Sequence, residues 1–182
     1  MLEGSDLSIP RWIARLDKSL AFWDRTLAEG RPVVGIGGAD AHGLVRFGLR
    51  LAPYGTLFKL VRNHLLVRGE VTEAAVYEAL EKGRLFVAHD ILTDARGFRF
   101  SAVKEDQLRG TMGERVHWEP GLQLRATLPV PGEMTLFLDG KPVEKARGRE
   151  GRFDVKGKGI YRLEVTLKGR PWIYTNPVYV IE

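Results

Sequence analysis

The second half of the chain alternates apolar and polar residues, and this period of two limits the fold more than any other feature of the sequence. In residues 122–128 and again in 161–167, every second residue is apolar and every residue between is polar or charged. Such alternation is typical of half-buried strands. Asp139-Gly140 has the sequence of a type I′ hairpin turn. Short strands with regular turn signals predict an Ig-like antiparallel β-sandwich.

In the first half of the chain the apolar residues are spaced differently. An apolar stripe spaced three or four residues apart predicts helix over residues 9–29. The short apolar run 33–36 predicts a strand buried on both faces. A second helix is expected between Thr72, as its N-cap, and Gly83, with the strand 85–88 directly after it. Strand, loop, helix and strand in this order indicate an α/β layer.

Together the two patterns predict an α+β fold in two parts. Residues 1–95 are expected to form a partial α/β layer, whose two or three strands are too few to close a barrel. Residues 96–182 are expected to form the β-sandwich. Trp172 and Tyr174 are expected to anchor the core of the sandwich or its junction with the α/β layer.

Two side chains that can bind a metal ion or transfer a proton follow the apolar run. The stretch 35–43 reads Gly-Ile-Gly-Gly-Ala-Asp-Ala-His-Gly. Asp40 and His42 are two residues apart, so in an extended backbone their side chains leave on the same side. A carboxylate and an imidazole together form half of a metal site or an acid/base pair. The structural alternative is that Asp40 caps the next segment and His42 is an ordinary loop residue.

Seven stretches of the chain resemble one known family in the same order. They are residues 22–25, 30–42, 58–66, 76–84, 97–102, 161–165 and 171–180. The series resembles the polymerase-and-histidinol-phosphatase (PHP) metallohydrolase superfamily, in particular its carbaryl-hydrolase-like branch. The resemblance implies that residues 1–95 are a truncated PHP-like segment, the terminal strands and helices of the barrel. It also implies that Asp40 and His42 are metal ligands.

The chain departs from that family at its start. The family enzymes begin with a His-x-His motif, whereas this chain has four His residues (His42, His64, His89 and His117) and no His-x-His. The resemblance therefore implies the C-terminal portion of such an enzyme, with a divalent metal (Zn, Mn or Fe) that this chain alone holds weakly. The other ligands would come from an N-terminal barrel half in a separate chain or from a homo-oligomer.

The implied reaction is metal-dependent hydrolysis of a small-molecule phosphoester, or of an amide or carbamate. The isolated chain is expected to be inactive, because one Asp and one His do not complete a site. The alternative hypothesis is a non-catalytic β-sandwich module with a vestigial metallohydrolase segment, which binds a protein or a glycan.

Other polar residues are candidates for the same site. His64, His89 and Asp90 are additional polar site residues, although the apolar neighbours of His64 also suit a buried, hydrogen-bonded imidazole. Arg46 and Arg50 follow the Asp-x-His motif, and their guanidinium groups are candidates for anion binding. The alternative for these two residues is ordinary solvated arginine.

Composition limits the remaining classes. The absence of Cys excludes disulfides and thiolate metal sites. The net charge of +5 includes a basic stretch over residues 141–158, which lacks a nucleic-acid motif and is interpreted as a solvated hairpin. No apolar run is long enough to span a bilayer, and residues 1–10 lack the layout of a signal peptide. A cytoplasmic protein without a membrane or nucleic-acid partner is therefore expected.

Overall fold

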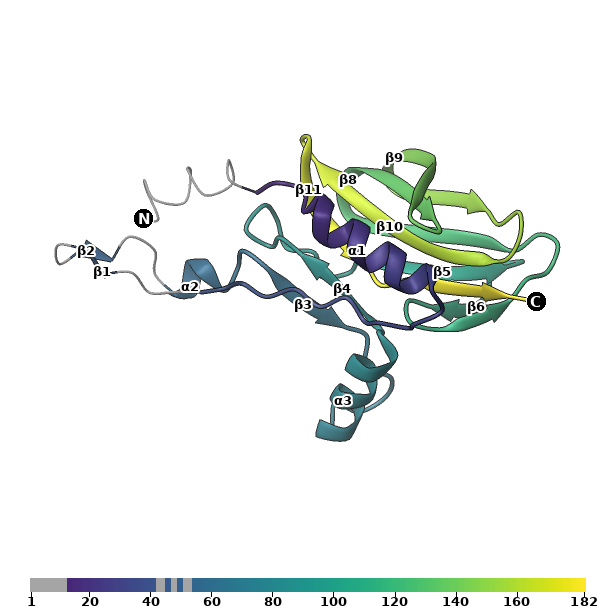
Figure 1. Ribbon diagram of the computed structural model, residues 1–182, viewed down its shortest axis with the longest axis horizontal. Coiled ribbons are helices and arrows are strands. Elements are labelled where there is room, and N and C mark those ends of the chain that lie inside the picture. Colours follow the sequence, from purple (N-terminus) through teal and green to yellow (C-terminus); the bar gives the residue numbers. More distant parts are fainter. Residues whose placement is uncertain (1–12, 42–44, 47–48, 51–53) are drawn as a thin grey trace.

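The structure is a computed structural model that describes residues 13–41, 45–46, 49–50 and 54–182. The described residues form three helices and twelve strands (Figure 1). In chain order these are α1 (Asp17–Ala28), β1 (Val45–Arg46), β2 (Leu49–Arg50), α2 (Tyr54–Leu57), β3 (Arg62–Leu65), α3 (Glu73–Lys82), β4 (Leu85–Ala88), β5 (Arg99–Lys104), β6 (Gln107–Thr111), β7 (Arg115–His117), β8 (Gln123–Leu138), β9 (Lys141–Asp154), β10 (Gly159–Leu167), β11 (Arg170–Thr175) and β12 (Val178–Ile181).

Ten of these strands form one curled half-barrel sheet. Its main path runs β3-β4-β11-β10-β8-β5-β6, while β9 pairs with β8, and β12 pairs with β10 and β7. Only the pairing of β12 with β7 is parallel among the described strands. The long strand β8 pairs with β5 through its first half and with β10 through its second half. The sheet therefore curls around a single core.

The predicted fold class, a partial α/β layer followed by an Ig-like sandwich, is wrong. The structure is mostly antiparallel β, with 45% strand and 16% helix, in a curled half-barrel sheet. The physical reason is that β4 pairs antiparallel with β11, which lies far along the chain. Strands from both sides of residue 95 thus join one sheet. The predicted strand 33–36 is an extended segment without a ladder partner among the described residues.

Local signals in the sequence were more reliable. Thr72 accepts a hydrogen bond from the Ala75 amide at 3.2 Å, and Gly83 ends α3 with a left-handed φ of 72°. The predicted turn at Asp139-Gly140 joins β8 to β9, with φ values of 49° and 77°. Both predictions are confirmed, because each depends on residues only a few positions apart.

The apolar core lies on the inner, concave face of the sheet. Trp172 is fully buried in it and donates its indole N–H to the Thr93 carbonyl at 3.0 Å, as expected for a core anchor. Strands β5, β8, β10 and β12 supply most of the cluster. Its largest fully buried members besides Trp172 are Phe98, Phe100, Phe153, Met112, Leu122, Leu124, Met134, Leu136 and Leu163.

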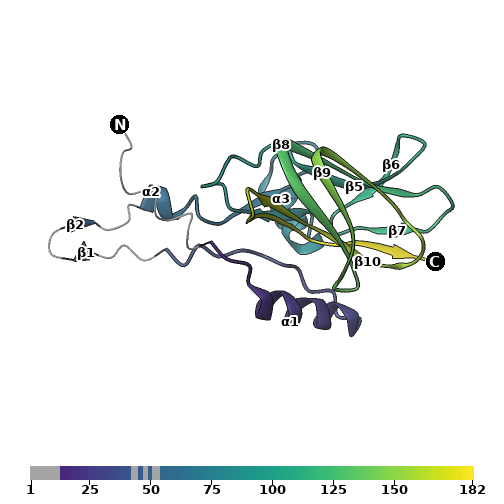
Figure 2. The same ribbon diagram turned by 90° about the horizontal axis from the view of Figure 1, so that it is seen from above.

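The opposite, outer face carries α1 and the chain that follows it. Directly paired residues share a face, so the register aligns Asn63, Val87, Tyr174 and Glu164 across β3, β4, β11 and β10. Arg162 lies two residues before Glu164 and projects on the same side. Figure 2 shows α1 beside the sheet, with the segment after the helix running back along the same side.

Helix α1 is attached to this outer face by a chain of alternating charges. The Arg162 guanidinium donates two hydrogen bonds of 2.6 Å to Asp24 on α1, and a third to Glu164. Glu164 in turn accepts two from Arg15, at 2.7 and 2.8 Å. The Arg162 guanidinium also lies 4.2 Å from the centroid of the Phe137 ring. We refer to Asp24, Arg162, Glu164 and Arg15 as the ion network.

Candidate functional site

The segment 31–41, which leads from α1 to Asp40, is extended and is held by two asparagine side chains. The Asn176 amide group accepts from the Gly35 N–H at 2.8 Å and donates to the Gly35 carbonyl at 2.9 Å. In the same way, the Asn63 amide group accepts from the Gly37 N–H and donates to the Gly37 carbonyl, both at 2.8 Å. Each side chain thus supplies the donor and the acceptor that a neighbouring strand would otherwise provide. We call this arrangement the asparagine clamp.

The two clamped residues must be glycine, because the segment lies very close to its surroundings. A Cβ on Gly37 would lie 2.5 Å from methyl groups of both Val61 and Val87. A Cβ on Gly35 would lie 2.7 Å from the ring of Trp23, whose indole N–H donates to the Val33 carbonyl at 2.8 Å. At these two positions the segment therefore packs against its neighbours through backbone atoms.

Asp40 stands at the end of this segment. Its side chain is exposed, and its φ of 44° places the backbone in the left-handed region, which Asp tolerates better than most residues. The backbone at Asp40 is thus not extended, as the prediction of a shared side for Asp40 and His42 had assumed. His42 lies outside the described residues, so its position beside Asp40 stays a prediction. The side chains of Arg46 and Arg50 also lie outside the description, and anion binding there stays a prediction.

The structure brings together two of the predicted polar residues, His64 and Asp90. The imidazole Nε2 of His64 lies 3.1 and 3.0 Å from the two Asp90 carboxylate oxygens. Asp90 also accepts from the Ala95 amide at 3.2 Å and lies 3.4 Å from the Arg62 guanidinium. The His64 ring stacks on Phe86 at 4.6 Å. The His64 imidazole is thus half-buried and hydrogen-bonded to Asp90, and its role in a site stays a prediction.

His89 is separated from Asp90 although the two are adjacent in sequence. Its Nδ1 lies 2.7 Å from the Leu60 carbonyl, so in the neutral ring Nδ1 carries the proton. Burial lowers the pKa of His89, which keeps the imidazole neutral at pH 7. Its ring lies edge-on to Tyr174 at 6.3 Å. Burial raises the pKa of Tyr174 to about 12, so the phenol stays protonated.

Among the described residues, no group of three or more His, Cys, Asp or Glu side chains converges in a way that could hold a metal ion. No helix in the described part of the chain is long and apolar enough to cross a membrane. Comparisons with protein-family models, with curated proteins and with solved structures find no match to this chain.

Sequence reasoning missed the two residues that form the asparagine clamp. Asn63 and Asn176 lie inside the stretches 58–66 and 171–180 that were quoted for the resemblance, but no role was assigned to either. The only signal was their presence beside the glycine-rich motif in one ordered series. Their pairing with Gly37 and Gly35 spans 26 and 141 residues, which no local pattern reports.

Proposed function

We propose that this chain supplies Asp40 and His42 to a divalent metal centre whose other ligands belong to another polypeptide or to a second copy of the chain. The observation that carries the proposal is the asparagine clamp. It fixes the backbone of Gly35 and Gly37, five and three residues before an exposed carboxylate, through side-chain amides and without a strand ladder among the described residues. A segment held so closely is suited to presenting a ligand at a defined point.

The donor set fits part of such a centre. A carboxylate and a neutral imidazole are ligands for Zn²⁺, Mn²⁺ or Fe²⁺, and a tightly held ion normally takes three or more protein ligands. Asp40 and His42 supply two, so the isolated chain should bind metal weakly. When bound, the metal would polarise the substrate and lower the pKa of a water molecule toward ~7. The part of this chain is to hold Asp40 in place through the clamped segment.

The exposed apolar side chains of the outer layer support a partner at this surface. Ile36 is 68% exposed, Phe22 59% and Val33 45%, although all three belong to α1 or to the clamped segment. A partner that packs on α1 and the clamped segment would cover these side chains, and contiguous exposed apolar surface is typical of interfaces. An N-terminal barrel half in a separate chain, or a homo-oligomer, would cover them and bring the missing ligands. The proposed reaction is that of a PHP-type hydrolase acting on a small phosphoester, or on an amide or carbamate.

The test is a calorimetric titration of the chain with ZnCl₂ and with MnCl₂. We expect a weak site that is lost in Asp40→Ala and in His42→Ala and retained in Asp154→Ala, an exposed carboxylate on β9 that serves as the control. Hydrolysis of p-nitrophenyl phosphate by the chain alone should stay at the background rate.

Two outcomes would contradict this proposal. Metal binding that is unchanged in Asp40→Ala and His42→Ala would remove Asp40 and His42 as ligands and favour the non-catalytic module. Stoichiometric metal that survives dialysis and supports turnover, in a chain that sediments as a monomer, would show that neither another polypeptide nor a second copy is needed.

A further inference from the structure

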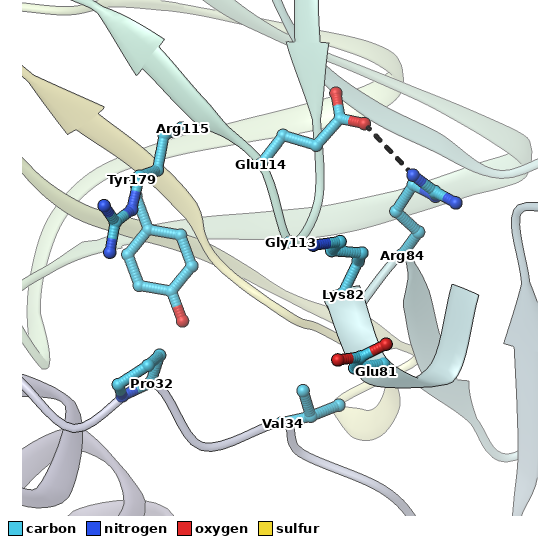
Figure 3. A pocket seen from close by; sticks show the side chains of 9 residues that line it. All are labelled: Pro32, Val34, Glu81, Lys82, Arg84, Gly113, Glu114, Arg115 and Tyr179. Atoms are coloured by element: carbon cyan, nitrogen blue, oxygen red, sulfur yellow. Dashed lines mark ion pairs between the residues drawn. The ribbon is translucent and has the colours of Figure 1, made fainter. Parts of the chain in front are cut away.

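A cleft of about 500 Å³, which Asp40 does not line, lies between the end of α3, the β6–β7 turn and the start of the clamped segment. Four parts of the chain meet there: residues 32–34, 81–84, 113–115 and Tyr179 on β12 (Figure 3). Its size is within the range of small-molecule sites. The contact of Gly113 with the C-terminus of α3 fixes one wall, because a Cβ on Gly113 would lie 2.0 Å from the Lys82 carbonyl.

Arg84 and Glu114 line the cleft, and both already have charged partners within the protein. Arg84 is 95% buried, at 5% relative exposure, and its guanidinium lies 2.8 Å from Glu78 and 3.8 Å from Glu114. Glu114 also accepts from Arg68 at 2.6 Å and from the Thr111 amide at 3.1 Å. The charge of Glu114 is therefore neutralised within the protein. The Nε of Arg84 is buried without a hydrogen-bond partner in the described structure.

Two further cations of the cleft are not paired in this way. Lys82 and Arg115 are exposed, and neither forms an ion pair with a carboxylate of the described residues. Figure 3 shows the Arg115 guanidinium and the Tyr179 side chain on one side of the cleft and the Lys82 side chain on the other, near Gly113, with Pro32 and Val34 below. Burial raises the pKa of Tyr179, with Arg115 opposing, so the hydroxyl remains a donor at pH 7.

We propose that this cleft binds a small organic anion, with a phosphate or carboxylate head group held by Lys82, Arg115 and the Tyr179 hydroxyl. Two cations that have no carboxylate partner among the described residues, and a neutral donor, line the same cleft and match the oxygens of such a group. The Tyr179 ring, Pro32 and Val34 form an apolar wall for the body of the ligand. Glu81, the one exposed carboxylate at the rim, opposes the anion and limits its affinity. This site is independent of the metal centre proposed above.

The test uses phenyl phosphate, benzoate and phenol as probes, on protein freed of metal with a chelating resin so that no soluble carboxylate chelator competes for the cleft. Amide shifts of the ¹⁵N-labelled full chain are followed at residues 113–115. We expect the two anions to bind with dissociation constants on the order of 1 mM and phenol not to bind. The tighter of the two anions identifies the preferred head group.

Matched variants then assign the contacts. Arg115→Gln and Lys82→Gln should each lower the affinity for the more tightly bound anion by about three- to tenfold, while Glu81→Gln should raise this affinity. Arg147→Gln on β9, whose side chain is 85% exposed, and Asp40→Ala should leave it unchanged. Equal binding of phenol and the anions, absence of shifts at 113–115, or wild-type affinity in both cation variants would each overturn the proposal.

Discussion

The two faces of the same sheet are held in opposite ways. On the inner face, side chains such as Trp172, Phe100 and Leu163 are fully buried in one apolar cluster. On the outer face, α1 buries Leu20 and Leu27 outside that cluster and is attached through the ion network, and the clamped segment is attached through backbone hydrogen bonds to Asn63 and Asn176. Apolar burial is non-directional and supplies stability, whereas hydrogen-bonded charges and amides fix a position.

The difference indicates a division of labour between the faces. A buried ion pair contributes little net stability but is costly to break, because the remaining charge is left without a partner. The outer layer is therefore expected to be well positioned but weakly held, and the inner core to carry most of the free energy of unfolding. The predictions below test this contrast.

The largest effect is expected on the inner face. Trp172→Ala removes a fully buried ring and its hydrogen bond to Thr93, and should lower the free energy of unfolding by about 3–5 kcal/mol. Val143→Ala on β9, where the side chain is 52% exposed, is the control and should change it by less than about 0.5 kcal/mol. Urea denaturation measures both. Equal effects would show that the indole is not part of the core.

The next effect is expected in the ion network. Arg162→Met leaves Asp24 and Glu164 without their shared cation, and should cost about 2–4 kcal/mol of unfolding free energy. Arg152→Met, with a side chain that is 65% exposed, is the matched control and should be close to neutral. If the two variants unfold at the same urea concentration, α1 is not held by this network.

A smaller effect is expected where the clamped segment meets the sheet. Gly37→Ala places a methyl group 2.5 Å from Val61 and Val87, and should cost about 1–3 kcal/mol while displacing the segment that leads to Asp40. Gly38→Ala meets no atom within 4 Å and should cost under about 0.5 kcal/mol. Thermal unfolding of the pair gives the comparison. A neutral Gly37→Ala would mean that the close packing is not required.

The smallest effect depends on pH. Burial raises the pKa of Glu164, but hydrogen bonds and charges from Arg15 and Arg162 outweigh it and hold the pKa below the ordinary 4.5. A carboxyl with a lower pKa in the folded state stabilises the fold above the unfolded pKa, and this contribution is lost as the pH falls through the folded pKa. Below pH 4.5, wild type should therefore lose stability more steeply than Glu164→Gln. If acid denaturation showed the stability of wild type and of Glu164→Gln falling in parallel below pH 4.5, the Glu164 carboxylate would not be stabilised by the two arginines.

The sequence predicted those features that a few adjacent residues determine. The helix from Thr72 to Gly83 and the turn at Asp139-Gly140 follow from cap and turn chemistry, and both are present. The strand at 33–36 was wrong because a strand needs a pairing partner, and apolar residues alone do not provide one. The fold class failed because antiparallel pairing of β4 with β11 depends on residues far apart in the chain.

The same distinction, between features set by adjacent residues and features set by distant ones, applies to the candidate site. Asp40 and its glycines were found as a motif, but the sequence assigned no packing role to the glycines. The structure gives Gly37 such a role, since the space beside Val87 admits no side chain. The pairing of His64 with Asp90 likewise depends on the register of β3 against β4, which the sequence did not specify.

Native-state amide hydrogen exchange tests the contrast between the faces most directly. The Gly35 and Gly37 amides report the clamped segment, and the Leu163 amide, bonded to Thr175 at 2.8 Å, reports the central sheet. If the outer layer is positioned but weakly held, both glycine amides should open locally, with protection factors at least about 100-fold below that of Leu163. Equal protection at all three amides would show that the outer layer and the core unfold as one unit, and would contradict the account.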